Sequence, residues 1–339
     1  METAPRIKMA DVAAKAGVSV ATVSKVVNGR YGVAKDTVEL VQGVIAELGY
    51  ESNLIAASLR NRRTNVLGIL VPDFEPFSAE LLKGAAIGAR GSGYELLSHS
   101  GGDQHGWERR SLSRLGGTLI DGAVLVTPTV LDARTIVPSV AVDPHFGPSS
   151  MPTIDADSYS GAQQATAHLL SLGHRRIAFL GGRSELDSAH LREAGYRRTM
   201  DEAGVPVDPS LVRETRYAPD RAAEITRDLL ELPDRPTAIF AANDVTAIRA
   251  MEVATEYGLS IPEDVSVVGF DDIPEASLAV PQLTTVRQPM QAMGRAAMEM
   301  LLEIINGVER ETHVRMSTEL IVRGSTAPPP KKLRPASIP

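Results

Sequence analysis

The chain contains no cysteine, which excludes disulfide bonds and thiolate chemistry. It also has no run of about 18 consecutive apolar residues, so no transmembrane helix is expected. The opening residues, METAPRIKMADV, contain neither the apolar core nor the small-residue cleavage site of a secretory signal. We therefore expect a soluble, cytoplasmic protein that has no membrane partner.

Signatures of catalysis are missing as well. The sequence has no G-x-x-x-x-G-K-[ST], no G-x-G-x-x-G at a strand end, no H-E-x-x-H and no G-x-S-x-G. Its seven histidines are scattered, and none of them pair at the spacing of metal ligands. We therefore expect no enzymatic activity, no cofactor and no metal site.

Charge is unevenly distributed along the 339 residues. The net charge is −7, but residues 1–65 carry nine Lys and Arg against six Asp and Glu. A small basic module joined to an acidic body is typical of DNA-binding regulators. An excess of three positive charges also occurs by chance, so the pattern of side chains is the stronger observation.

The first 50 residues show the periodicity of three short helices. Apolar side chains share one face in each, and a glycine and a serine stand where a turn and an N-cap would separate the first two. The third helix is expected at about 36–48. The apolar positions are Val12, Ala13 and Ala16, then Val23, Val26 and Val27, then Val38, Val41, Ile45 and Leu48, with Gly17 and Ser19 at the turn. This pattern predicts a helix-turn-helix with a small core of its own.

The outward face of the second helix carries small or hydrogen-bonding side chains. Small side chains let a helix enter the major groove, and Lys25 can reach the O6 and N7 atoms of guanine. Hydroxyl and amide groups can bind phosphates. The residues are Val20, Ala21, Thr22, Ser24, Lys25 and Asn28. An ordinary helical hairpin with a polar face is the alternative.

The segment MADVAAKAGVSVATVSKVVNG resembles the DNA-binding head of the LacI/GalR family of bacterial transcriptional repressors. The resemblance implies that Val20, Ala21 and Lys25 read bases and that Ser19 belongs to the same DNA-binding surface. The family places Thr or Ser where this chain has Lys8 and Ala34, at the N-caps of the first and third helices. Each lost cap is expected to cost ~1 kcal/mol.

Residues 51–63, ESNLIAASLRNRR, form a short, lightly apolar and then basic segment. It could be a flexible tether. The family resemblance implies a hinge that becomes helical on operator DNA, with Leu59 inserted into the minor groove and Asn53 and Ala56 packed nearby. A helix this short is unstable alone in water, but a partner helix and a groove can stabilise it.

From residue 65 onward, apolar runs such as NVLGILVP, DGAVLVTP, RRIAFLGG and VSVVGFDD alternate with amphipathic stretches. This alternation predicts parallel βαβ units in two doubly wound lobes. An enzyme of Rossmann type is the alternative. Polar residues follow several strands, where ligands of such sheets bind: Asp73, Asn243, Asp244, Asp271 and Asp272. For Asp244 and Asp272, capping of the next helix is the simpler interpretation.

The segments LGHRRIAFLGG, SAHLREAGYRR, PTAIFAANDVTAIRAM and IPEDVSVVGFDDIPEASLAVPQLTTVRQP are similar to the effector-binding core of the same family, which resembles periplasmic sugar-binding proteins. The likeness implies an α/β fold: a three-helix helix-turn-helix head and a periplasmic-binding-protein-like core of two doubly wound parallel-sheet lobes. It also implies effector contacts. These fall on Phe77, Ser78, Asp157, His190, Arg192, Tyr217, Asn243, Asp271 and Gln288.

The expected domains follow from these segments. Residues 1–50 form the DNA-binding domain, 51–63 the hinge or linker, 64–325 the effector-binding and dimerisation core, and 326–339 a disordered, proline-rich tail. The family chain crosses between lobes three times. The first lobe is therefore expected at about 64–160 and 290–318, and the second at about 161–289 and 319–325.

The sequence thus predicts a homodimeric repressor that binds a pseudo-palindromic operator and releases it when a small effector binds, with a sugar or oligosaccharide as inducer. A purine-type corepressor in the same fold is the alternative within this class, although a planar base would need aromatic side chains on both faces. Outside the class of repressors, the alternative is a sugar-binding transport protein. The DNA-binding head disfavours that function.

Overall fold

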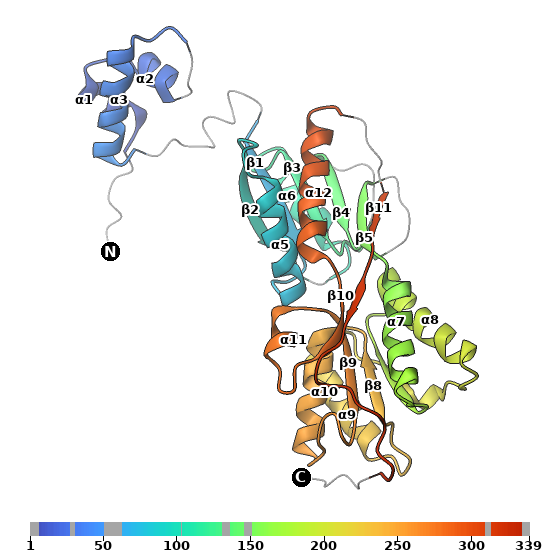
Figure 1. Ribbon diagram of the computed structural model, residues 1–339. Coiled ribbons are helices and arrows are strands. Elements are labelled where there is room, and N and C mark those ends of the chain that lie inside the picture. Colours follow the sequence, from blue (N-terminus) through green and yellow to red (C-terminus); the bar gives the residue numbers. More distant parts are fainter. Residues whose placement is uncertain are drawn as a thin grey trace. The chain divides into compact units, whose positions relative to one another are not determined.

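A computed structural model describes residues 7–27, 31–50, 63–102, 104–130, 136–145, 151–308 and 313–333. The chain divides into two compact units, residues 1–64 and 65–339, which we call the head and the core (Figure 1). Within the described ranges, no helix has the length and apolar character needed to cross a membrane.

The head is built from three helices, α1 (Met9–Ala16), α2 (Val20–Val27) and α3 (Lys35–Leu48). Gly17 has a φ of 66° and ends α1, a left-handed conformation that glycine adopts without strain. The helices enclose one small cluster of buried side chains, which are Val12, Ala13, Ala16, Val23, Val41 and Val44. The predicted helix-turn-helix is confirmed.

The starts of the three head helices are capped unequally. The hydroxyl of Ser19 accepts a hydrogen bond from the main-chain N–H of Thr22 at 3.1 Å, which caps α2. Lys8 and Ala34 occupy the N-caps of α1 and α3, and neither side chain hydrogen-bonds to its helix. Asp11 partly compensates in α1, because its carboxylate accepts from the main-chain N–H of Lys8 at 2.7 Å.

The core contains two six-stranded sheets, one in each lobe (Figure 1). Every strand pair of the first sheet is parallel, and in the second only β12 runs antiparallel to its neighbour. The first sheet has the order β11 (His313–Met316), β5 (Thr153–Ala156), β4 (Ser139–Val142), β3 (Gly122–Val126), β1 (Val66–Val71) and β2 (Glu95–Ser100). The second has the order β12 (Glu319–Ile321), β10 (Thr284–Arg287), β9 (Ser266–Asp271), β8 (Ala238–Ala241), β6 (Ile177–Gly181) and β7 (Val212–Glu214).

Helices cover both sheets, which explains why the central strands read as continuous apolar runs. Strands β3, β6, β8 and β9 are buried along their whole length. The helices of the first lobe are α5 (Pro76–Gly88), α6 (Trp107–Leu115) and α12 (Met290–Ile305). Those of the second are α7 (Ser158–Ser171), α8 (Asp187–Glu202), α9 (Pro219–Leu230), α10 (Asp244–Glu256), α11 (Pro274–Leu278) and the 3-10 turn Pro209–Leu211. The predicted pair of doubly wound lobes is confirmed.

The chain passes between the lobes three times, after β5, after β10 and after β11. The second passage leads into α12, which packs against α5 at glycines on both helices. A Cβ at Gly84 would lie 2.0 Å from the carbonyl oxygen of Gln291, and one at Gly294 would lie 2.1 Å from that of Leu81. Helix α5 is therefore in main-chain contact with α12, the helix that the chain forms when it returns to the first lobe.

The proline-rich tail begins in an ordered conformation, contrary to the prediction of disorder from residue 326. The Nε2 atom of His174 donates to the carbonyl oxygen of Ala327 at 2.8 Å, and Thr326 shares a hydrogen bond of 2.9 Å with His168. The prediction is wrong for these residues because buried polar groups of the second lobe, including the hydroxyl of Ser266, find their partners in the tail.

Candidate functional site

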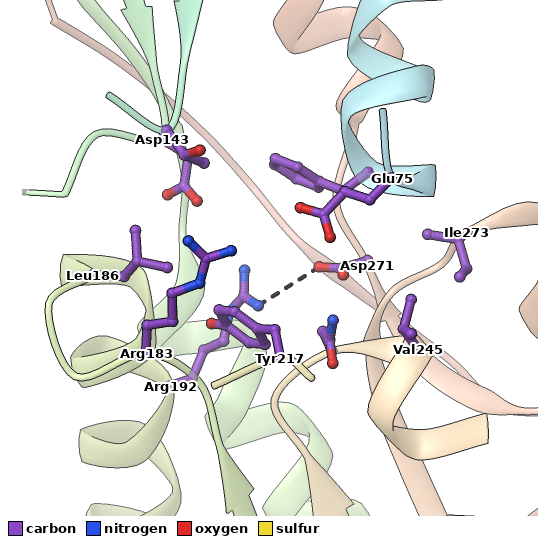
Figure 2. Close-up of a pocket in the computed structure, with 12 residues that line it drawn as sticks. Glu75, Asp143, Arg183, Leu186, Arg192, Tyr217, Val245, Asp271 and Ile273 are labelled. Carbon is purple, nitrogen blue, oxygen red and sulfur yellow. Dashed lines mark ion pairs between the residues drawn. The ribbon is translucent and has the colours of Figure 1, made fainter. Parts of the chain in front are cut away.

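A cavity lies where the carboxyl ends of the strands of the two lobes face each other. Its empty space is about 540 Å³, counting the part open to solvent. Both lobes contribute side chains from loops and helix starts (Figure 2). The first lobe supplies Glu75, Phe77, Thr127 and Asp143, and the second supplies Arg183, Leu186, Arg192, Tyr217, Asn243, Val245, Asp271 and Ile273.

The floor of the cavity holds a buried ion pair between Arg192 of α8 and Asp271 at the end of β9. The two side chains approach to 3.6 Å and are 4% and 7% exposed. Arg192 also donates to the carbonyl oxygen of Ala242 and stacks over the ring of Phe270, 3.9 Å from its centroid. These contacts fix the guanidinium against the second lobe while leaving it at the cavity wall.

Asp271 is held from behind by Gln288, whose Nε2 donates to the carboxylate at 2.7 Å. Burial raises the pKa of Asp271 to about 7, although Arg192 and Gln288 both act to lower it. A second carboxyl, Asp244, lies behind the first and is fully buried. Burial and the neighbouring Asp271 raise the pKa of Asp244 well above its usual value. Two carboxyl groups in one dry site disfavour each other's ionisation.

Asn243 lies in the cavity wall, at the N-cap of α10. Its side-chain oxygen accepts hydrogen bonds from the N–H and the hydroxyl of Thr246, at 3.2 Å and 2.5 Å, so it caps the helix. Because this oxygen is occupied, only the amide N–H groups of Asn243 are left for a ligand, and they act as hydrogen-bond donors.

The ring of Tyr217 forms an aromatic wall. The ring lies against the main chain of Gly182, and its hydroxyl is buried without a hydrogen-bond partner among the described residues. Burial raises the pKa of this phenol to about 12. A buried hydroxyl without a partner is uncommon, and this one belongs to a residue that lines the cavity.

Strained main chain gathers around the cavity. Positive φ angles of 44°, 47°, 62° and 121° occur at Thr127, Asp143, Tyr217 and Asp271. Each residue lies at or just beyond the carboxyl end of a strand. Such conformations are costly for residues other than glycine, and they collect at ligand sites where a side chain must be aimed.

Acidic groups of the first lobe complete the cavity. Asp143 and Glu75 project toward the side chains of the second lobe (Figure 2). Burial raises the pKa of Asp143 to about 6, against the opposing effect of Arg192. Burial also raises the pKa of Glu75, while the positive charge of Arg183 lowers it. The cavity therefore presents carboxyl groups from both lobes and guanidinium groups from the second lobe.

The structure brings together five of the nine predicted effector contacts, which are Phe77, Arg192, Tyr217, Asn243 and Asp271. The other four lie outside the lining. Ser78 is fully buried in α5, and its hydroxyl has no partner among the described residues. Gln288 stands behind Asp271, Asp157 caps α7 through the N–H of Ser160, and His190 lines a separate surface hollow.

Sequence reasoning missed Glu75, Thr127, Asp143, Arg183, Leu186, Val245 and Ile273. Asp143 could have been found, because it directly follows the apolar run SVAV. Arg183 and Glu75 lie in loops, where the side chain's direction depends on the fold.

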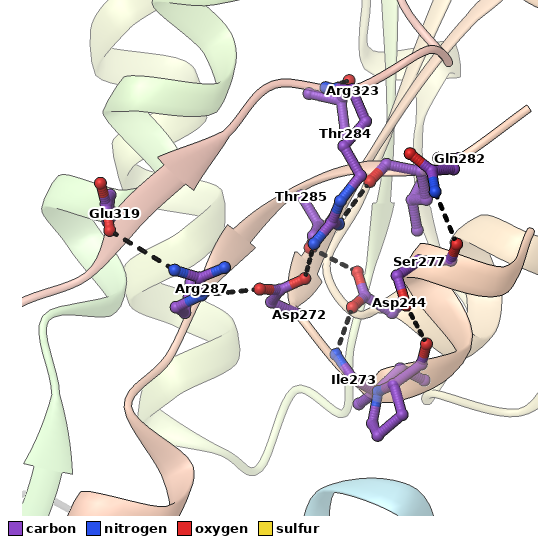
Figure 3. Close-up of polar contacts among 12 residues, drawn as sticks. Asp244, Asp272, Ile273, Ser277, Gln282, Thr284, Thr285, Arg287, Glu319 and Arg323 are labelled. Carbon is purple, nitrogen blue, oxygen red and sulfur yellow. Dashed lines mark hydrogen bonds and ion pairs between the residues drawn. The ribbon is translucent and has the colours of Figure 1, made fainter.

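Asp244 and Asp272 do not cap helices, so that interpretation is wrong. Asn243 is the cap of α10, and Asp244 instead accepts from the N–H of Ile273 and the hydroxyl of Thr285 (Figure 3). Asp272 pairs with Arg287 at 2.7 Å and with Arg323 at 2.6 Å. Asp244 therefore joins the start of α10 to β10 and to the turn after β9, and Asp272 joins that turn to β10 and to the segment after β12.

In the head, the predicted base-reading positions lie on the solvent side of α2. Val20 is 48% exposed, and Ala21 and Lys25 are also exposed. Thr22 is half-buried, and its hydroxyl is 2.9 Å from that of Ser19. Ser24 is half-buried. The remaining predicted DNA contacts, Asn28, Asn53, Ala56 and Leu59, lie outside the described residues.

Comparisons with known proteins match both units. The model for bacterial regulatory proteins of the lacI family matches residues 8–53, and that for the periplasmic binding protein-like domain matches 166–326. The HTH-type transcriptional repressor PurR of Haemophilus influenzae is 34% identical over 328 residues, covering 93% of this chain and 97% of the relative. CytR of Escherichia coli, also an HTH-type transcriptional repressor, is 32% identical over 333 residues, covering 96% of this chain and 97% of the relative.

Solved structures agree with these relatives. The lac repressor dimer bound to operator and the anti-inducer ONPF has a TM-score of 0.82 at 27% identity, covering 95% of this chain and 99% of that one. The complex of the transcriptional regulator CelR with cellobiose has a TM-score of 0.70 at 32% identity, covering 94% of this chain and 100% of that one.

Proposed function

The chain belongs to the LacI family of bacterial regulatory proteins and is a DNA-binding transcriptional repressor controlled by a small-molecule effector; from this premise, we propose that its effector is a sugar or oligosaccharide that releases operator DNA. The cavity between the lobes is the proposed effector site, and the repressor acts as a homodimer on a pseudo-palindromic operator. Two-fold symmetry of the protein then matches that of the DNA.

The observation that carries this proposal is the set of polar groups around the cavity. Asp271 and Arg192 on one side and Asp143 on the other can accept from and donate to neighbouring hydroxyl groups of a sugar ring. The amide of Asn243 adds further donors. The face of Tyr217 can cover the C–H surface of the ring. The similarity to a regulator solved with cellobiose supports the same ligand class.

A purine-type corepressor remains the alternative because of one observation. Phe77 of the first lobe and Tyr217 of the second both line the cavity, and a planar base between two aromatic rings would be well held. The acidic groups favour the sugar, since a base offers fewer donors to Asp143, Glu75 and Asp271 than a polyol does.

A thermal unfolding screen against sugars and purine bases distinguishes these ligands. At a concentration of 100 times its Kd, a ligand stabilises the protein by ~2.7 kcal/mol. We expect stabilisation by a mono- or oligosaccharide in wild-type protein and its loss in Arg192→Ala. Stabilisation by a purine base alone would contradict the sugar assignment.

For the DNA contacts, we propose the exposed face of α2, with Val20, Ala21 and Lys25 at base edges. The exposure of these side chains supports the proposal, and Ser19, Thr22, Ser24 and Asn28 are proposed at or beside the phosphates. Residues 51–63 are proposed as a hinge that places Leu59 in the minor groove beside Asn53 and Ala56. Replacing Leu59 by alanine should then weaken operator binding at least tenfold, or ~1.4 kcal/mol.

A further inference from the structure

Helix α8 begins without a cap of its own. Its N-cap is Leu186, whose apolar side chain makes no capping hydrogen bond. The first N–H groups of any helix lack a partner within the helix and need an acceptor elsewhere. The side chain of Leu186 supplies no such acceptor.

The opposite lobe supplies an acceptor for one of these N–H groups and another for a side chain of the first turn. The N–H of Asp187 donates to the carbonyl oxygen of His145 at 3.1 Å, and the hydroxyl of Ser188 donates to Oδ2 of Asp143 at 3.2 Å. Asp143 and His145 follow β4 in the first lobe, whereas Asp187 and Ser188 open α8 in the second. Ser188 is 4% exposed and His145 is 8% exposed, so both contacts are shielded from water.

Asp143 is also part of the cavity wall. Its left-handed main chain, with a φ of 47°, turns the residue sharply after β4. Among the described residues, only Ser188 hydrogen-bonds to its carboxylate, through Oδ2. Oδ1 is therefore available to a ligand while the bond to α8 stays in place.

We propose that the first lobe caps α8 across the cleft through the carbonyl oxygen of His145, and that Ser188, whose hydroxyl binds Asp143 in the first turn of the helix, is the positioning residue that holds this carboxylate for the ligand. A negative group near a helix N-terminus is favoured by the helix dipole, so the cap holds the two lobes together at this point. A ligand that donates to Oδ1 then strengthens the same junction. The link to the ligand rests on the proposed function, whereas the cap itself does not.

Hydrogen exchange of the ligand-free, full-length protein tests the cap directly. In Ser188→Ala, the contact between the lobes is weakened, so the amide of Asp187, which donates to His145, should exchange about tenfold faster than in wild type, while the amides in the middle of the helix keep their rates. Ser188→Thr retains the hydroxyl and should restore slow exchange. Ser184→Ala is the matched control, because Ser184 is exposed in the preceding loop and plays no part in the cap. Equal exchange at the start of α8 in all four proteins would overturn the proposal.

A distance measurement provides a second, independent test. The absence of native cysteine allows spin labels at Ser113→Cys on α6 and Asp201→Cys on α8, both at exposed positions in different lobes. Adding Ser188→Ala should shift the label-to-label distances toward larger values, and adding Ser184→Ala should leave them unchanged. Identical distributions in both proteins would overturn the cap as a junction between lobes. Because no ligand is present, failure here leaves the proposed effector site untouched.

Discussion

The ring of Tyr217 lies on the main chain of Gly182 so closely that a Cβ at position 182 would be 2.1 Å from the ring's Cζ atom. Gly182 follows β6, and Tyr217 lies in the loop after β7. Because residue 182 has no side chain, the Tyr217 ring can lie against its main chain and form the aromatic wall of the cavity.

Gly182→Ala should displace the Tyr217 ring and weaken effector binding by at least tenfold, or ~1.4 kcal/mol, because the ring and the new methyl group cannot both occupy this space. Operator affinity without effector should stay close to that of wild type. Gly181→Ala is the control, since a Cβ there comes no nearer than 3.3 Å to another heavy atom. Calorimetric titration with the sugar found by thermal screening measures both variants, and equal affinities would refute the assigned role of the contact.

Asp271→Asn should change how stability depends on pH. The pKa of Asp271 is raised from 3.8 to about 7 in the folded protein, so the stability that its proton provides is present below pH ~4 and is lost as the pH rises through 7. Asparagine does not titrate. The variant should therefore gain at least ~1 kcal/mol relative to wild type between pH 4 and pH 8.

Urea unfolding of both proteins across this pH range gives the comparison. Other titrating groups, such as the buried His145, occur in both proteins and largely cancel. Asp201→Asn, at an exposed position of α8, serves as the control and should follow the wild-type curve. Parallel curves for wild type and Asp271→Asn would show that Asp271 does not take up a proton in the folded state.

Lys25→Ala should relax the preference for one base pair in each half-site by ~1–3 kcal/mol. Lys25 is exposed on α2, and a lysine in the major groove reads guanine. Binding selections from randomised operators, carried out at fixed salt, report the preference at each position. An even loss of affinity over all sequences would instead identify Lys25 as a phosphate contact.

Ala34→Ser should stabilise the head by ~0.5–1 kcal/mol, because it supplies the missing N-cap of α3. Amide exchange in α3 of the full-length protein measures this stability. The same change at the exposed Ala46, inside α3, should be neutral or slightly destabilising. A stabilising effect of similar size at both positions would remove capping as the explanation.

Much of the fold could be predicted from the sequence because strands buried on both faces leave long apolar runs. IFAA before Asn243 and VVGF before Asp271 marked both the strands and the polar groups at their ends. The short strands β7, β11 and β12 lie at sheet edges and carry charged residues, so their pattern is weak. These segments are strands because each pairs with a neighbouring strand, and that pairing depends on the whole fold.

The site was predictable where a side chain follows a strand and much less so elsewhere. Asn243 and Asp271 follow that rule. Asp157 and His190 were placed by family resemblance, but local geometry directs them to a helix cap and to a surface hollow. Glu75 and Arg183 come from loops of opposite lobes. Their meeting depends on how the lobes face each other, which no local pattern encodes.

Release of operator by a carbohydrate is the central claim, and a binding titration tests it most directly. An operator fragment selected from random DNA by this protein is labelled, and its fluorescence anisotropy is followed while sugars or purine bases are added to wild type and to Arg192→Ala. We expect that a sugar releases DNA from wild type, that Arg192→Ala binds the same DNA but does not respond, and that purines have no effect. If a purine tightens operator binding, or if the sugar acts equally on Arg192→Ala, the cavity does not have the assigned function.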